Sequence, residues 1–313
     1  MFDKIDKLVD SVLHKNKRSL TESKKDDLSK SFTQYMKSGN TFSPVGPIVL
    51  VPKLESCAYE VSFSPSGLIF EKVRPRTDSL LKFEDSTMSK VLSEVKRFWS
   101  LKDNFNKLGF LHNRGILLYG PPGTGKTCLV HQIAEGMIEQ EDTIMFGKNI
   151  NIVSEALNAF RQIEPDRRVV VVLEDMDEYI GYSERDALQL LDGTNSVDNV
   201  LFIGTTNYIE KFPPRLLRPG RFDRRVKIGF PPYEGRLAYL NNKLNGIVEA
   251  GEIEQLAEKT DGFSFGHLRE LVIAGYAFQE DVEHTLKRLR GVSYPDLPER
   301  EDSYLSECIN KRK

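Results

Sequence analysis

The chain has 313 residues, with 44 lysines and arginines against 46 aspartates and glutamates, so its formal net charge is only −2. A balance this close creates no overall field that would draw the protein to nucleic acid or to an anionic membrane. Apolar runs of strand length and a charged N-terminus predict neither a membrane span nor a signal peptide, and three widely spaced cysteines favour a reducing, cytoplasmic setting.

The N-terminal part combines helix and strand patterns. Apolar residues at helical spacing predict two short amphipathic helices, at 5–13 and 28–36. Alternating apolar and polar residues around a cluster of turn residues predict a β-hairpin over 59–73. A helix with one apolar face, capped by serine and threonine, is expected at 86–101. We expect residues 1–80 to form an α+β region for recruitment or regulation.

The stretch "GPPGTGKT" at 120–127 fits the phosphate-loop pattern G-x-x-x-x-G-K-[ST]. It lies between an apolar strand and a segment of helical periodicity, so a glycine-rich turn without a ligand is the weaker interpretation. Glycines let backbone N–H groups approach phosphate oxygens, and the following helix adds the positive end of its dipole. Lys126 would neutralise the β- and γ-phosphates, and Thr127 would offer its hydroxyl to Mg²⁺. The expected nucleotide-binding residues are Gly120, Pro121, Pro122, Gly123, Thr124, Gly125, Lys126, Thr127 and Cys128.

Two further apolar runs end in polar residues. "VVVVLEDMDE" ends in carboxylates at 174–178, and "NVLFIGTTN" ends in the amide of Asn207. Buried strands of α/β proteins deliver side chains at their carboxyl ends into the ligand crevice, so Glu174 and Asp175 are expected to face a magnesium nucleotide. Asn207 would orient a water near the γ-phosphate. The alternative for the acids is that they cap a strand and face solvent. The alternative for the last three residues of "NVLFIGTTN" is that they form only a turn.

These segments, followed by "RPGRFDR" at 218–224, resemble the AAA branch of the AAA+ ATPases. The resemblance extends over residues 85–290 and rests on several motifs in the same order. It implies ATP and Mg²⁺ as cofactors and the glycine-rich loop as Walker A. By the same resemblance Glu174 and Asp175 occupy Walker B, and Asn207 is sensor 1.

The resemblance also makes Arg221 and Arg224 arginine fingers. Guanidinium groups stabilise the charge on transferring phosphoryl oxygens, and a finger from another subunit is worth about 10³ to 10⁵ in rate. Pro219 and Gly220 would present both arginines on a rigid turn. From the residues alone, a solvated basic patch or a nucleic-acid contact would also fit. The resemblance implies that the fingers reach a neighbouring subunit's ATP, within a homo-oligomeric ring that we expect to be a hexamer.

Walker B departs from the family pattern, in which aspartate precedes glutamate. Here Glu174 precedes Asp175. One methylene moves a carboxylate by roughly 1.5 Å, so a slow or inactive ATPase is one alternative. The same "LEDxD" string is typical of the subgroup that resembles the mitochondrial Rieske-protein translocase, although no membrane segment is expected here. We therefore expect an active site in which Thr127 and Glu174 bind Mg²⁺, with Asp175 as the group that activates water and as a second candidate Mg²⁺ ligand.

Ring translocases of this family that thread polypeptide carry an aromatic-apolar-glycine loop between Walker A and Walker B. The nearest match is "IMFGK" at 144–148, which is either such a loop or a strand with its turn. "YIGYSE" at 179–184 is a second candidate, although Tyr179 and Tyr182 would equally fit as packing residues.

The fold class that follows is α/β, a parallel P-loop NTPase sheet with helices on both faces at 81–232. A small helical lid is expected at 233–290 and a tail at 291–313. "GFSFGHL" resembles the family's lid motif "GFSGADL", which places Gly266 beside the nucleotide. Asp261 or Ser264 would cap the helix that starts there, and His267 is expected to be structural or solvent-facing and not catalytic. No H-E-x-x-H zinc motif occurs in the sequence, so peptidase activity is not expected.

The function that these patterns favour is a Mg-ATP-dependent ring ATPase that remodels or moves a macromolecule, with an unidentified protein as substrate or adaptor. One alternative is a scaffold that assembles on nucleotide binding and hydrolyses ATP slowly or not at all. The other is a nucleic-acid motor or loader, against which the balanced charge argues. Neither nucleic acid nor a membrane is an expected partner.

Overall fold

A computed structural model of the chain describes residues 34–38, 41–45, 50–64, 67–74, 87–192 and 197–291. The chain divides into two compact units, Met1–Pro52 and Lys53–Lys313. None of the helices within the described ranges is both long and apolar enough to cross a membrane. The helix predicted at 5–13 and the tail predicted from residue 291 lie outside the described residues, except for Gly291.

The first unit contains a hairpin in which β1 (Gln34–Ser38) pairs antiparallel with β2 (Thr41–Val45). The predicted helix at 28–36 is therefore wrong at its C-terminal end, where Tyr35 and Met36 belong to β1. Gly39 and Asn40 separate the two strands, and a glycine-asparagine pair between strands is a hairpin signal. Pairing with β2 outweighs the helical spacing of a few apolar residues, because local pattern is a weak prior against a ladder of hydrogen bonds.

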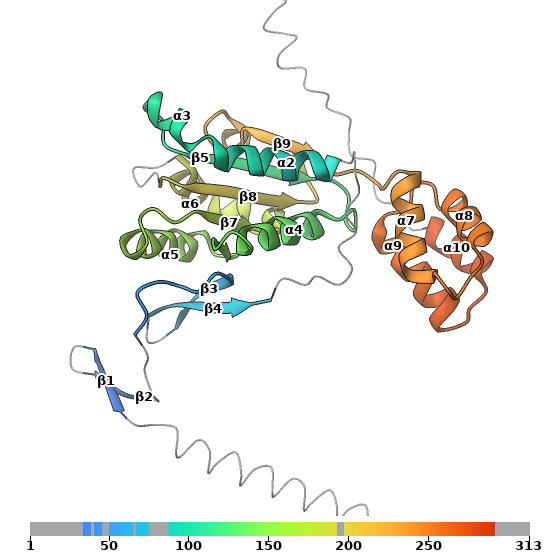
Figure 1. The fold of residues 1–313 in the computed structure, drawn as a ribbon, viewed down its shortest axis with the longest axis horizontal. Helices are drawn as coiled ribbons and strands as arrows, with labels where there is room; N and C mark the ends of the chain where they lie inside the picture. Colours follow the sequence, from blue (N-terminus) through green and yellow to red (C-terminus); the bar gives the residue numbers. More distant parts are fainter. Residues whose placement is uncertain are drawn as a thin grey trace, which may run out of the picture. The chain divides into compact units, whose positions relative to one another are not determined.

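The second unit is built on a seven-stranded sheet with the order β4-β3-β6-β7-β8-β5-β9 (Figure 1). Neighbouring strands are parallel except for the antiparallel pair of β3 and β4. The expected α/β class with a parallel P-loop sheet is confirmed. The strands are β3 (Ala58–Ser64), β4 (Gly67–Val73), β5 (Asn113–Tyr119), β6 (Thr143–Phe146), β7 (Val169–Leu173), β8 (Val200–Thr206) and β9 (Arg224–Lys227).

The hairpin predicted over 59–73 is confirmed as β3 and β4, and β3 pairs with β6 of the central sheet. Its strands therefore extend the same sheet that carries the phosphate loop, although the sequence places them in the N-terminal region. The predicted division of the chain into parts with separate roles is not tested by these contacts and stays a prediction. The parts are 1–80, 81–232, 233–290 and 291–313.

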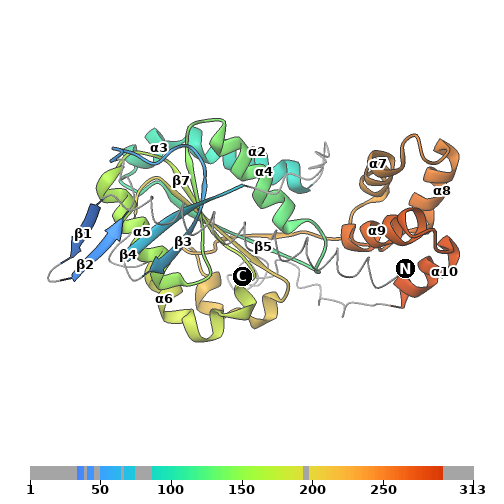
Figure 2. The ribbon, with the colours of Figure 1, turned by 90° about the horizontal axis from the view of Figure 1, so that it is seen from below.

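Helices cover both faces of the sheet because its central strands are apolar on both sides. In β7, Val169, Val171 and Leu173 pack against α5 (Ile150–Ile163) and α6 (Ile180–Asp192). The alternating residues Val170 and Val172 pack against α2 (Thr87–Ser100) and α4 (Lys126–Ile138). Figure 2 shows α2 and α4 on one side of the sheet and α6 on the other. The short helix α3 (Lys102–Lys107) follows α2, whose predicted apolar face is confirmed.

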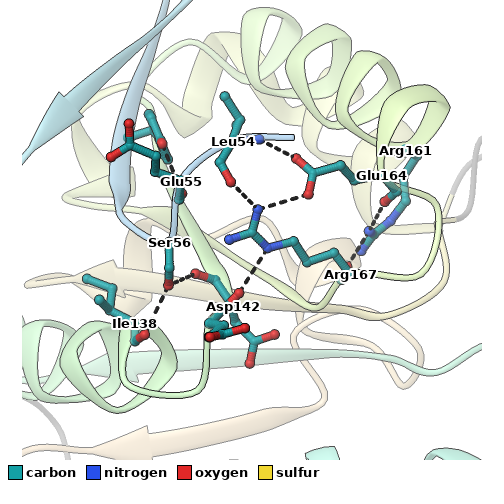
Figure 3. Close-up of polar contacts among 10 residues, drawn as sticks. Leu54, Glu55, Ser56, Ile138, Asp142, Arg161, Glu164 and Arg167 are labelled. Carbon is teal, nitrogen blue, oxygen red and sulfur yellow. Dashed lines mark hydrogen bonds and ion pairs between the residues drawn. The ribbon is translucent and has the colours of Figure 1, made fainter. Parts of the chain in front are cut away.

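A polar network fastens the segment before β3 to two connections of the core (Figure 3). The Leu54 N–H donates to Glu164 Oε1 at 2.8 Å, and the Leu54 carbonyl accepts from Arg167 Nη1 at 2.6 Å. Arg167 and Glu164 also form an ion pair at 2.8 Å. The Ser56 hydroxyl contacts the carbonyl oxygens of Ile138 and Asp142, both at 2.9 Å. The start of β3 is thus held by the segments that precede β6 and β7.

The C-terminal part is helical, as predicted, and has its own apolar cluster, which includes Leu240, Ile253 and Leu268. Arg236 is 4 % exposed and links its helices by donating to the carbonyl oxygens of Ala257 and Pro231 at 3.1 and 3.0 Å. The elements are α7 (Tyr233–Leu244), α8 (Ala250–Lys259), α9 (Phe265–Val272), a π-helical turn (Ile273–Ala277) and α10 (Val282–Arg290).

Candidate functional site

The glycine-rich loop connects the end of β5 to the start of α4, as its motif predicts. Gly120, Gly123 and Gly125 have φ angles of 149°, 74° and 100°, which side chains strongly disfavour. A Cβ on Gly120 would lie 2.1 Å from the Ile228 carbonyl oxygen, and one on Gly123 would lie 2.9 Å from Ser264 Oγ. The loop therefore needs glycine both for its backbone path and for the space it occupies.

Lys126 is the buried cation of the loop, with a side chain only 6 % exposed. Its Nζ donates to the carbonyl oxygens of Gly120 and Pro121 at 2.8 and 2.9 Å. Burial lowers the pKa of Lys126 to about 8, although Asp175 and Asp177 act in the opposite direction. Phosphate charge beside the ammonium group would stabilise its protonated form.

Thr127 and Glu174 come together at the position expected for Mg²⁺. Burial raises the pKa of Glu174, while electrostatic interaction with His131, a hydrogen bond from the Thr127 side chain and the charge of Lys148 act in the opposite direction. A hydroxyl and a carboxylate oxygen in contact are the hard donors that Mg²⁺ prefers. The residues present therefore fit a Mg-nucleotide, with Thr127 and Glu174 as the protein ligands of the ion. Sequence reasoning missed His131 and Lys148, because their approach to Glu174 depends on the packing of α4 and β6.

Asp175 begins the turn after β7 in the left-handed conformation, with φ 47° and ψ 46°. Its backbone N–H donates to Thr205 Oγ1 at 2.9 Å. Asn207 directly follows the end of β8, and its N–H donates to Asp177 Oδ1 at 3.0 Å. The carboxyl ends of β7 and β8 thus bring Asp175 and Asn207 to the same edge of the sheet as the phosphate loop.

The helical part contacts the phosphate loop through the start of α9. The Gly266 N–H donates to the Gly123 carbonyl at 3.3 Å, and the place of Gly266 beside a nucleotide stays a prediction. Of the two predicted caps, Ser264 is the N-cap of α9 and Asp261 pairs instead with Arg236 at 3.1 Å. His267 has a structural contact, as predicted, because its Nδ1 lies 2.9 Å from Ser264 Oγ.

Two apolar side chains that the sequence did not single out flank the loop. Met88 of α2 and Phe265 of α9 both lie beside Gly125, where an added Cβ would meet Met88 Cε at 2.7 Å and the Phe265 ring at 3.5 Å. Cys128, the last residue assigned to the loop, is half-buried, and burial raises the pKa of its thiol. Gln132 Nε2 lies 3.8 Å from its sulfur.

The two candidate arginine fingers are not brought to the chain's own phosphate loop. A Cβ on Gly115 would lie 2.1 Å from the carbonyl oxygen of Arg221, so the backbone there packs against the start of β5. Gly115 and Gly120 are five residues apart along β5, a distance of about 16 Å in an extended strand. Arg224 is paired in register with Ile116 and forms an ion pair with Glu94 of α2 at 2.9 Å.

The candidate gripping loop at 144–148 is largely a strand. Ile144 and Met145 are fully buried in β6, and the Phe146 ring packs against His131 with centroids 6.3 Å apart. Gly147 also lies inside the fold, because an added Cβ would meet Val153 at 2.4 Å. In the second candidate segment Tyr179 packs against the core, whereas Tyr182 on α6 is 83 % exposed.

Part of the chain matches a known protein family. Residues 116–230 match the family described as "ATPase family associated with various cellular activities (AAA)". The chain therefore carries an AAA ATPase domain, and it has homologues in the AAA+ family.

One relative is the "ATP-dependent zinc metalloprotease FtsH 2" of Thermoanaerobacter sp. (strain X514), 32 % identical over 60 % of this chain and 41 % of that protein. The "Proteasome-activating nucleotidase" of Aeropyrum pernix is 33 % identical over 55 % of this chain and 47 % of the relative. The "Cell division cycle protein 48 homolog" of Archaeoglobus fulgidus is 30 % identical over 59 % of this chain and 27 % of that protein. The chain thus spans less than half the length of each of these relatives.

Proposed function

We propose that this protein is a Mg-ATP-dependent ring ATPase that uses hydrolysis to remodel or move a protein substrate. The observation that carries the proposal is the convergence of a glycine loop, a buried lysine, the pair Thr127 and Glu174, and the strand ends with Asp175 and Asn207. This arrangement supports the proposal because it would suit a triphosphate, its metal and an attacking water at one edge of a sheet.

In this proposal the chain's own residues divide the chemistry. Lys126 would bind the phosphates, Thr127 and Glu174 would bind Mg²⁺, and Asp175 would accept a proton from the water that Asn207 orients. The bound Mg²⁺ would neutralise charge on the phosphates. Because Glu174 rather than Asp175 contacts Thr127, the reversed order of the two acids is compatible with separate roles for them.

The position of Arg221 supports the ring. Its backbone lies beside Gly115, about 16 Å along β5 from the phosphate loop of the same chain. If Arg221 contacts a nucleotide, that nucleotide therefore belongs to another subunit. We propose Arg221 as the principal finger, because its backbone lies at the start of β5, and Arg224, which pairs with Glu94, as its support.

Subunit mixing tests this proposal. Lys126→Ala would remove phosphate binding and Arg221→Ala would remove the finger, so each variant alone should have at least about 10³-fold lower Mg-ATP turnover. Mixing the two should restore part of the turnover, because a subunit with an intact loop then meets a subunit with an intact finger. Wild-type turnover per subunit should also rise with protein concentration. Turnover that is independent of concentration, together with no recovery on mixing, would contradict a shared site.

A specific observation favours the scaffold as the second candidate. Among the described residues, the connection from β6 to α5 comprises 147–149 and that from α5 to β7 comprises 164–168. These connections are short, and the "IMFGK" segment is mostly buried, so a protruding gripping loop between Walker A and Walker B has no support here. Two measurements separate the candidates. Loss of substrate processing with unchanged ATP turnover in Tyr182→Ala supports a motor. Assembly of the wild-type protein on binding ATP, without turnover, supports the scaffold.

A further inference from the structure

A hydrogen-bonded bridge joins the turn after β7 to the end of β8. Asp177 Oδ1 accepts from the Thr206 hydroxyl at 2.7 Å and from the Asn207 N–H at 3.0 Å. The Thr206 hydroxyl in turn accepts from the Tyr208 N–H at 3.0 Å. Thr206 itself is fully buried, whereas Asp177 is half-buried. The Asp177 carboxylate therefore holds the N–H group of Asn207, and the Thr206 hydroxyl that it contacts holds the N–H group of Tyr208.

The bridge lies beyond the regular pairing of the two strands. The β7–β8 ladder ends with Leu173 opposite Gly204. Asp175 then contributes its own N–H to Thr205 Oγ1, in the left-handed conformation. The β7–β8 pairing therefore positions neither Asp175 nor Asn207 directly. Beyond its last residue pair, hydrogen bonds to side chains connect the two segments.

We infer that Asp177 is a positioning residue for ATP hydrolysis, one that holds Asn207 in register with Asp175 across the ends of two strands. The inference rests on the proposed function, because Asp175 and Asn207 are the groups assigned to the attacking water. Asp177 needs no contact with the nucleotide for this role. It acts through the backbone of Asn207, and a misplacement of about 1 Å at such a group can cost about 100-fold in rate.

The role depends on an acceptor oxygen and not on charge, and this distinction makes it testable. Asp177→Asn keeps an oxygen that can accept both hydrogen bonds, whereas Asp177→Ala removes it. We expect Mg-ATP kcat to fall by about 10- to 100-fold in Asp177→Ala with KM changed by less than about threefold, and Asp177→Asn to stay within about threefold of wild type. Glu178→Ala is the matched control, because it removes the neighbouring, exposed carboxylate.

Hydrogen exchange of the Asn207 amide supplies a readout that does not require turnover. Its protection should drop at least about tenfold in Asp177→Ala and be retained in Asp177→Asn and Glu178→Ala. If Asp177→Ala does not fold, Thr206→Val and Thr206→Ser replace it, with loss of kcat expected only for valine. Unchanged kcat in Asp177→Ala, or an equal loss in Asp177→Asn, overturns the inference. Wild type that binds Mg-ATP without turnover overturns the proposed function instead, and the amide exchange still decides whether Asp177 holds Asn207.

Discussion

At the scale of single residues, the site depends on a few side chains whose ionisation is set by burial. Lys126 is nearly inaccessible to solvent, and its Nζ contacts two carbonyl oxygens of its own loop. Burial lowers its pKa to about 8, so the folded protein disfavours the charged form of this lysine relative to the unfolded chain. Nucleotide-free protein therefore carries an electrostatic cost at the position that a triphosphate would occupy.

This cost predicts how stability depends on pH. Below pH 8 Lys126 is protonated in both states, whereas between about pH 8 and 10.5 the unfolded chain binds the proton more tightly. The free energy of unfolding of wild type should then rise relative to Lys126→Met, by up to about 3 kcal/mol across that window. Urea denaturation of both proteins at pH 7 and pH 10 measures the difference. If the difference in the free energy of unfolding between the two proteins is the same at both pH values, burial does not perturb the pKa of this lysine.

The sequence predicts these residues well where a motif requires them and poorly where packing brings them together. The phosphate loop, Glu174, Asp175 and Asn207 all follow from strand ends and glycine spacing. His131 and Lys148 approach Glu174 only because α4 and β6 lie side by side, and no local pattern marks either residue. Asp177 did leave a signal, as the third acid of "LEDMD", but its partners lie on another strand.

At the scale of elements, the hairpin β3–β4 shows that local sequence pattern predicts strands but not the strand of the sheet with which they pair. Its alternation of apolar and polar residues predicts two strands, and both are present. That β3 joins β6 depends on contacts with segments over a hundred residues away, above all the Arg167–Glu164 pair that holds Leu54. The C-terminal end of the helix predicted at 28–36 is wrong for a related reason, because the pairing of β1 with β2 outweighs a short apolar pattern.

The network around Leu54 predicts a measurable difference between a buried and an exposed ion pair. The side chains of Arg167 and Glu164 are 13 % and 8 % exposed, so Arg167→Ala would leave a buried carboxylate without its cation. We expect a loss of about 3 kcal/mol in the free energy of unfolding. Lys259→Ala is the control, because its ion pair with Glu283 is exposed and should be worth less than about 1 kcal/mol. Similar losses in urea denaturation of the two variants would refute a structural role for the network.

At the scale of the whole second unit, the helical part and the sheet meet at the phosphate loop. The Gly266 N–H donates to the carbonyl of Gly123, and Met88 and Phe265 both lie beside Gly125. In the proposed function, a nucleotide bound in this loop would therefore lie beside both parts.

The two glycines at this junction give a matched pair of substitutions. A Cβ on Gly266 would meet its neighbours at 3.4 Å and 3.7 Å, a distance that the structure tolerates, and no left-handed backbone is required there. A Cβ on Gly123 would lie 2.9 Å from Ser264 Oγ, and the φ of 74° adds strain. Gly266→Ala should therefore keep the Kd for Mg-ATP within about threefold, whereas Gly123→Ala should weaken binding at least about tenfold, equivalent to about 1.4 kcal/mol.

Titration with a fluorescent ATP analogue in the presence of Mg²⁺ measures both values, and thermal unfolding without nucleotide reports any general loss of stability. If both variants bind as wild type does, the contact between α9 and the loop opens without cost when nucleotide enters. If Gly266→Ala is the more damaging change, the two parts approach more closely in the bound state than the 3.3 Å hydrogen bond between Gly266 and Gly123 implies. The expected order, with damage at Gly123 alone, would mean that nucleotide binds to the junction in the arrangement described.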